Sequence, residues 1–149
     1  MDNLDYGILA HLLEDSRERM QAIARKLRVS EGTIRNRLQK MEGEKLITQY
    51  TLLLDPGKLG YKASAFIGLT VEPARFFSVL QAVSKIEEVR FACSCSGEYS
   101  IFIEVWKRDA NAMAKFLDEK ISKIQGVLKI SPNIVVERVK FGKGPLKFD

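Results

Sequence analysis

The chain has few of the residues that usually carry catalysis or metal binding. Its 149 residues include one histidine, His11, and two cysteines, Cys93 and Cys95. Zinc sites are commonly built from four such ligands, and the histidine is far from both cysteines in sequence. A Gly-rich phosphate loop and a nucleophile motif are also missing. We therefore expect no metal, no cofactor and no catalytic residue.

Long hydrophobic runs and a secretion signal are missing as well. No apolar run approaches the ~18 residues of a membrane span, and acidic Asp2 and Asp5 stand where a secretion signal carries positive charge. These absences predict a cytoplasmic protein without a membrane partner. Because cysteines separated by one residue suit a disulfide poorly, we expect reduced, structural thiols, with a redox switch as the alternative.

What the chain does have is a cluster of positive charge near its N-terminus. Residues 17–43 contain eight basic and three acidic side chains, and the whole chain has a net charge of +5. Apolar residues in this segment are spaced as in two short helices joined by a tight turn. Cations concentrated on a helix-turn-helix are what binding to a phosphate polyanion requires. The segment therefore predicts binding to double-stranded DNA.

Hydrophobic spacing predicts three helices, over residues 4–15, 20–27 and 31–44. Ser30 precedes the third, where its hydroxyl is suited to accept a hydrogen bond from an early helical N–H. Ile34, Leu38 and Met41 recur every three or four residues and should be buried. Gly43 weakens or ends this helix.

The face of the third helix opposite that apolar stripe is the candidate reader of DNA sequence. Asn36 and Gln39 are suited to adenine and Arg35 to guanine, while Gly32 would let the backbone approach the groove. On an isolated helix Arg35 would be read as a solvated charge, but within this motif we expect it to contact DNA. Arg37 either contacts DNA or braces the motif against Glu14 or Asp15. The remaining candidates are the flanking Thr33 and Lys40, and three residues expected to touch phosphate, Arg17, Arg28 and Ser30.

The remainder of the chain predicts a second domain with an alternating pattern. A β-rich stretch at 47–54 leads to a turn at Asp55-Pro56-Gly57. Strands then follow at 62–71, 89–96, 99–106 and 127–140, with helices at 74–85 and 109–124. This β-α-β-β-α-β order is ferredoxin-like, so the fold class is α+β. The predicted parts are a helix-turn-helix domain at 1–46, a β linker or hinge at 47–60, and a ferredoxin-like domain at 61–149.

Several fragments, taken in order, resemble the leucine-responsive/AsnC (Lrp/AsnC, feast/famine) family of transcription regulators over essentially the full length. The fragments are Leu4-Asp5-Tyr6-Gly7-Ile8-Leu9, Ile23-Ala24-Arg25-Lys26-Leu27, Ser30-Glu31-Gly32-Thr33-Ile34-Arg35-Asn36-Arg37-Leu38, Lys45-Leu46-Ile47, Asp55-Pro56-Gly57-Lys58-Leu59-Gly60, Gly97-Glu98-Tyr99-Ser100 and Gln125-Gly126-Val127. Two positions depart from the family: Lys45 stands where glycine is usual, and Ser100 where aspartate is common.

The resemblance implies a sequence-specific transcription regulator that forms homodimers and assembles further, commonly to octamers. It also implies an amino-acid-like effector held near Gly97, Tyr99 and Ser100, although the missing aspartate argues against ordinary amino-acid sensing. Aromatic side chains of the second domain either form ordinary core or line a surface between subunits: Phe91, Tyr99, Phe102 and Trp106. A cationic tail, of Arg138, Lys140, Lys143 and Lys147, either touches phosphate or is simply solvated.

Two other functions compete with regulation. Relatives of this architecture resemble haem-pathway decarboxylases, but the second domain contains no histidine to serve as a proton donor. An architectural, DNA-compacting protein fits the positive charge, yet such proteins rarely carry a second domain of this size. We therefore expect a regulator and not an enzyme.

Overall fold

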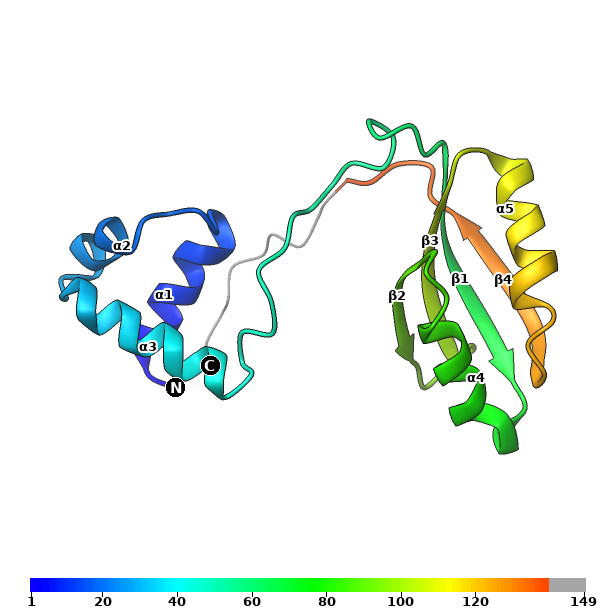
Figure 1. Ribbon diagram of the computed structural model, residues 1–149, viewed down its shortest axis with the longest axis horizontal. Helices are drawn as coiled ribbons and strands as arrows, with labels where there is room; N and C mark the ends of the chain where they lie inside the picture. Colours follow the sequence, from blue (N-terminus) through cyan, green and yellow to red (C-terminus); the bar gives the residue numbers. More distant parts are fainter. Residues whose placement is uncertain (140–149) are drawn as a thin grey trace. The chain divides into compact units, whose positions relative to one another are not determined.

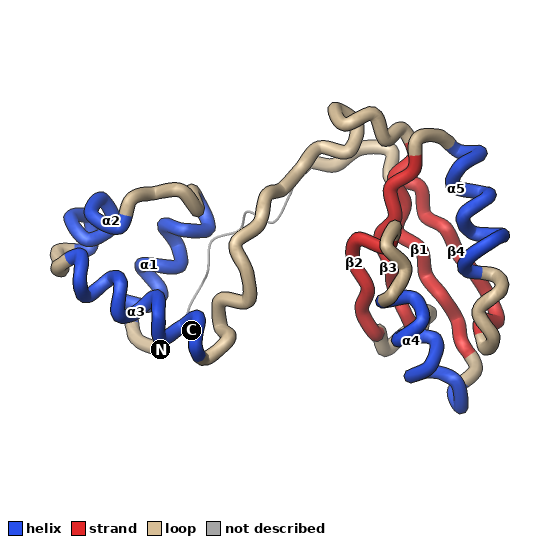
Figure 2. Tube along the Cα trace, viewed as in Figure 1, coloured by secondary structure: helices blue, strands red, loops and turns tan. Residues whose placement is uncertain are grey.

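The computed structural model describes residues 1–139, which form two compact units, Met1–Leu53 and Leu54–Arg138 (Figure 1). The first unit is helical. The second is a sheet with helices packed on it (Figure 2).

The first unit is a three-helix bundle around a small apolar core. Its helices are α1 (Asn3–Glu14), α2 (Met20–Leu27) and α3 (Glu31–Gly43), which confirms the three predicted helices to within one residue at each end. The buried side chains recur at helical spacing because each helix turns one apolar stripe inward. They are Ile8, Ile23, Ala24, Ile34, Leu38 and Met41.

The turn between α2 and α3 is fixed by the backbone and by one side chain. Arg28 ends α2 in the left-handed conformation, with φ of 58°. Ser30 then caps α3 as predicted: its Oγ accepts the Thr33 N–H at 3.0 Å. The cap satisfies a backbone donor that the first turn of a helix leaves without an intrahelical partner.

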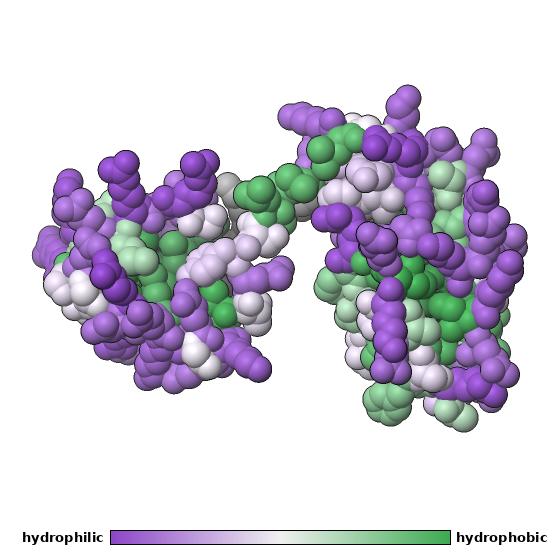
Figure 3. All heavy atoms as spheres, viewed as in Figure 1, coloured by the Kyte–Doolittle hydropathy of each residue, from purple (hydrophilic) through white to green (hydrophobic). Residues whose placement is uncertain are grey.

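The segment that follows α3 is not the strand that its β-rich sequence predicted. Residues 48–55 form neither helix nor strand, and that part of our prediction is wrong. A strand requires backbone partners on a neighbouring strand, and none of the described residues pairs with this segment. Its leucines are left open to solvent, with Leu52 73% and Leu53 61% exposed, and the hydrophobic run is visible in Figure 3. Asp55 then caps the expected turn by accepting the Gly57 N–H at 2.8 Å.

The second unit is the predicted ferredoxin-like fold. Its strands are β1 (Ala63–Val71), β2 (Val89–Ser94), β3 (Ile101–Lys107) and β4 (Val127–Ile134). Helix α4 (Phe76–Ser84) follows a 3-10 turn at Pro73–Arg75, and α5 (Ala110–Phe116) continues as a π-helical turn, Leu117–Ile121. All strand pairs are antiparallel, in the order β2-β3-β1-β4. The last strand ends earlier than predicted, and Lys140 lies outside the described residues.

The core of this unit lies on one face of the sheet only. Alternate residues of β1 and β3 pack with Val79 and Val83 of α4 and with Met113 and Phe116 of α5 in one cluster. Because side chains alternate across a strand, the residues between them face the other way. The two helices therefore cover one face, and the opposite face, here called the open face, has no helix of this unit on it (Figure 2).

Candidate nucleic-acid interface and effector hollow

Helix α3 presents a polar, solvent-exposed face opposite its buried stripe. Ile34, Leu38 and Met41 are at most 5% exposed and fix the rotation of the helix. The three predicted base readers, Arg35, Asn36 and Gln39, are all exposed. Gly32 and Lys40 are exposed as well. The structure thus brings together, on one helix face, side chains able to pair with the edges of bases.

Two features of this face suit a close approach by a ligand. A Cβ added at Gly32 would come no nearer than 3.7 Å to another side chain, Ser30 Oγ, so packing does not require glycine there. Arg35 pairs with Glu31 at 2.9 Å, but both side chains are about half exposed. An exposed i,i+4 pair contributes little to stability, so Arg35 can exchange it for another partner.

The predicted phosphate contacts lie around the start of this helix and in the loop between α1 and α2. Arg17 and Arg28 are exposed. The Ser30 hydroxyl also shares a hydrogen bond with the Thr33 hydroxyl at 2.8 Å. Ser30 and Thr33 therefore have a structural role in the cap, whatever contact they make with DNA.

Arg37 braces the helical bundle instead of facing outward with the base readers. Its guanidinium lies 2.6 Å from Asp2 Oδ2 and 3.1 Å from Asp5 Oδ1. These two carboxylates raise the pKa of Arg37, while the Asp5 N–H and the Arg37 side chain lower the pKa of Asp2. The bracing role is as we considered, but the partners Glu14 and Asp15 were wrong, because the capping box of α1 holds Asp2 and Asp5 at the N-terminal end.

We expect Arg37→Ala to lower the thermal stability of the helical unit. Removing the guanidinium leaves the carboxylate of Asp5, a residue only 4% exposed, without its ionic partner. Thermal unfolding of the full chain, followed by circular dichroism, should show that the helical unit of this variant melts at a lower temperature than in the parent. Arg35→Ala is the matched control on the same helix and should melt as the parent does, because its ion pair is exposed. Equal melting of both variants would contradict the bracing role.

Sequence reasoning missed a second brace between α1 and α2. Glu18 pairs with Lys26 at 2.7 Å and with His11 Nδ1 at 3.1 Å. Hydrogen bonding from Lys26 is the main cause of the lowered pKa of Glu18. The signal in the sequence is Glu18 itself, one of only three acidic residues among the cations of residues 17–43.

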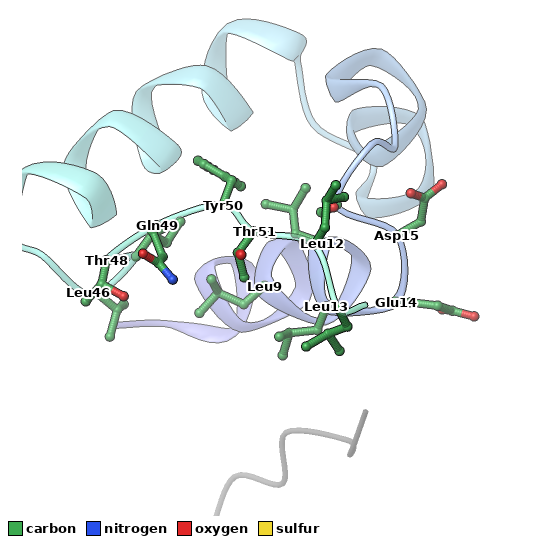
Figure 4. Close-up of a pocket in the computed structure, with 14 residues that line it drawn as sticks. Leu9, Leu12, Leu13, Glu14, Asp15, Leu46, Thr48, Gln49, Tyr50 and Thr51 are labelled. Carbon is green, nitrogen blue, oxygen red and sulfur yellow. The ribbon is translucent and has the colours of Figure 1, made fainter. Parts of the chain in front are cut away.

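An apolar groove of the first unit was also missed. It measures about 660 Å³ and lies between α1 and the segment after α3. Figure 4 shows Leu9, Leu12 and Leu13 of α1 on one side, with Tyr50 on the segment that crosses them. The Tyr50 hydroxyl donates to Glu42 at 2.8 Å, and burial together with this bond raises the pKa of Tyr50 to about 12.

The three predicted effector residues lie together at one end of the sheet. Gly97, Tyr99 and Ser100 line a hollow of about 390 Å³, together with Val71, Pro73, Phe76, Phe77 and Cys95. No charged side chain contributes to this lining. Ser100 is held by its N–H, which donates to the Leu69 carbonyl at 2.9 Å. The ring of Tyr99 lies over Gly68, where an added Cβ would be 2.4 Å from a ring atom.

The open face of the sheet carries most of the aromatic residues singled out in the sequence. Phe102 stacks on Phe66 with centroids 5.7 Å apart and lies 6.3 Å from Tyr99, while Phe91 is 49% exposed. Trp106 is nearly buried, and its indole N–H donates to Glu104 at 2.8 Å.

Arg138 belongs to this open face and not to a solvated tail. It is bonded to Glu104 and, at 2.6 Å, to Ser64 Oγ. The prediction of a solvated tail is therefore wrong for Arg138, because its long side chain reaches the Glu104 carboxylate on β3. The other three tail cations, Lys140, Lys143 and Lys147, lie outside the described residues.

A helix-turn-helix with an exposed polar face, followed by a ferredoxin-like unit, defines a two-part DNA-binding regulator. The family model for the AsnC-type helix-turn-helix domain matches residues 1–42, and that for the Lrp/AsnC ligand binding domain matches residues 64–145. The chain belongs to the Lrp/AsnC family of transcriptional regulators, and it is a DNA-binding regulator of transcription.

Similar proteins span nearly the whole chain. The transcriptional regulator LrpA of Pyrococcus horikoshii is 35% identical over 140 residues, which are 94% of this chain and 99% of that protein. Regulatory protein AsnC of Escherichia coli is 35% identical over 138 residues, or 92% and 91%.

Solved structures share the fold. The structure of Escherichia coli AsnC superposes with a TM-score of 0.84 at 33% identity, covering 95% of each chain. A transcriptional regulator of Neisseria meningitidis, solved with L-Met, has a TM-score of 0.85 at 23% identity, covering 99% and 96%. Among residues 1–139, no helix is both long and apolar enough to cross a membrane.

Proposed function

We propose that the chain reads operator DNA with the exposed face of α3. The observation that carries this proposal is the exposure of Arg35, Asn36 and Gln39 on one side of a helix whose other side is buried. The N-terminal half of such a helix enters the major groove, where these side chains discriminate between bases. Arg17, Arg28 and Lys40 supply phosphate contacts, and Ser30, Gly32 and Thr33 bring the helix start to the groove.

We also propose that two copies associate through the open face of the second unit and that the dimers assemble further. Exposed Phe91 and the stacked Phe66 and Phe102 leave apolar area on this face that a second copy would cover. A two-fold dimer presents two recognition helices to half-sites one helical turn apart. The proposed parts are a DNA-binding domain at 1–46, a hinge at 47–60 and an assembly and sensing domain at 61–149.

The hollow beside Gly97, Tyr99 and Ser100 is the proposed site of a small, amino-acid-like effector. The regulator of Neisseria meningitidis was solved with L-Met, and the aromatic lining here suits an apolar side chain. Since no charged residue lines the hollow, backbone N–H groups of the turn would hold a carboxylate. The relatives are transcription regulators, and we propose no catalytic role.

The first test is a titration of the purified protein against a labelled duplex from its own upstream region and a scrambled duplex. At each of several salt concentrations, the upstream duplex should bind at least about 10³-fold more tightly, as is typical of specific over non-specific binding. Affinity for both duplexes should fall as salt rises, because binding releases counterions. Equal affinity for the two would favour the architectural role, and no binding at low salt would refute the DNA-reading proposal.

A further inference from the structure

The two cysteines converge at the end of strand β2. Cys93 lies on the strand and Cys95 directly follows its last residue, Ser94. Side chains two residues apart point to the same side of a strand, and here the Sγ atoms are 3.7 Å apart. A disulfide needs about 2.05 Å between sulfurs, so the two sulfurs must move closer together before the bond can form.

The two thiols differ in their surroundings in a way that divides their roles. Cys95 is exposed, whereas Cys93 is half-buried. Burial, and then the hydrogen bond with Cys95, raise the pKa of the Cys93 thiol. Because the thiolate is the reactive form, Cys93 is a poor first nucleophile, and Cys95 meets an oxidant first. An exposed thiol beside a sheltered neighbour is the arrangement of a redox-sensing cysteine with its resolving partner.

We propose that Cys93 and Cys95 close into an intramolecular disulfide when the protein meets a hydroperoxide. The Cys95 thiolate attacks the O–O bond, forms a sulfenic acid and, after protonation of the leaving oxygen, releases water or an alcohol. The Cys93 sulfur then attacks the sulfenic sulfur, the S–S bond forms, and the hydroxyl leaves as water with the Cys93 proton. Two electrons pass from the two thiols to the peroxide.

The short separation in sequence makes this disulfide a reversible one. A ring closed through a single intervening residue departs from relaxed disulfide geometry, and strained disulfides are more easily reduced. Thiols are therefore the resting state in a reducing compartment, as the sequence predicts. The disulfide forms when the oxidant rises and is lost when it falls.

Closing the disulfide acts on the turn that follows β2. The Cys95 N–H donates to the Ser100 carbonyl at 2.9 Å, and Cys95 lines the same hollow as Gly97 and Tyr99. Moving Cys95 toward Cys93 strains that hydrogen bond and alters the wall of the hollow. An effect on effector binding rests on the proposed function of the hollow, whereas disulfide formation does not.

The test uses the full chain, fully reduced, freed of reductant and exposed to hydrogen peroxide. After alkylation of remaining thiols, intact-mass spectrometry should show both thiols lost together, with a mass lower by two hydrogens. Dithiothreitol should restore both thiols. Disulfides between chains, over-oxidation without loss of hydrogens, or no reaction would each overturn the proposal.

Single substitutions separate the roles of the two thiols. Cys93→Ser should accumulate a sulfenic acid at Cys95 that a dione reagent traps, while Cys95→Ser should react at least about tenfold more slowly than the parent. Equal rates in the two variants would overturn the assignment. Hydrogen exchange of the Cys95 amide should be faster in the oxidised protein, and unchanged exchange would refute the coupling to the turn.

Discussion

Replacing Asn36 with alanine should remove most of the preference for one base pair of the operator while leaving the fold intact. Asn36 is exposed on α3, so its loss disturbs no packing. A bidentate contact between asparagine and adenine discriminates by about 1–3 kcal/mol, or roughly five- to 150-fold in affinity. Titration against the upstream duplex and against duplexes with single base-pair changes should show lower affinity for the operator and a loss of discrimination at one position.

Arg28→Ala is the matched control, because Arg28 is also exposed but lies in the turn before α3. It should weaken binding to operator and random duplex by the same factor and lower the salt dependence by about one phosphate contact. Arg35→Ala should behave as Asn36→Ala does, at a different base pair. If all three variants lose the same factor on both duplexes, the assignment of α3 as the sequence reader is wrong.

Replacing Gly68 with alanine should destabilise the second unit and displace the ring of Tyr99. Gly68 is buried in the central strand β1, and an added Cβ would lie 2.4–2.6 Å from three ring atoms of Tyr99. Overpacking of this kind typically costs about 1–3 kcal/mol. Urea unfolding followed by the fluorescence of Trp106, the one tryptophan of the chain, should report the loss at fixed protein concentration.

A second substitution identifies the cause. In a Tyr99→Ala background the obstructing ring is absent, so Gly68→Ala should cost much less than in the parent, and the two substitutions should be strongly coupled. Gly43→Ala, in helix α3 of the first unit, is the control for glycine replacement itself when unfolding of that unit is followed by circular dichroism. Nothing lies within 4 Å of a Cβ there, so it should not destabilise. An equal cost of Gly68→Ala in both backgrounds would show that Tyr99 is not what the new methyl group meets.

The contrast between Arg35 and Arg37 shows how far sequence reasoning reaches within the site. Periodicity placed Ile34, Leu38 and Met41 inside and the base readers outside, since a helix of known start has only one rotation that buries that stripe. It left open whether Arg37 faces DNA or the bundle. The choice depends on Asp2 and Asp5, more than thirty residues away in sequence, and only packing brings them within 3.1 Å.

The strand predictions for the segment after α3 and for the end of β4 were wrong for a related reason. Both are rich in β-branched or large apolar residues, and local propensity predicted strands over 47–54 and 127–140. A strand exists only where another strand supplies backbone donors and acceptors. Within the described chain 47–54 has no such partner, and β4 ends at Ile134, where its pairing with β1 ends.

The sequence by itself determined the three helices, the capping by Ser30, the β-α-β-β-α-β order and the exposed reading face, because each depends on local spacing and on near neighbours. Only the tertiary structure decided the partners of Arg37 and Arg138 and the packing of the Tyr99 ring on Gly68. Those features depend on where side chains from distant segments meet in space. The local sequence pattern does not predict these contacts, because they are set by the packing of the whole unit.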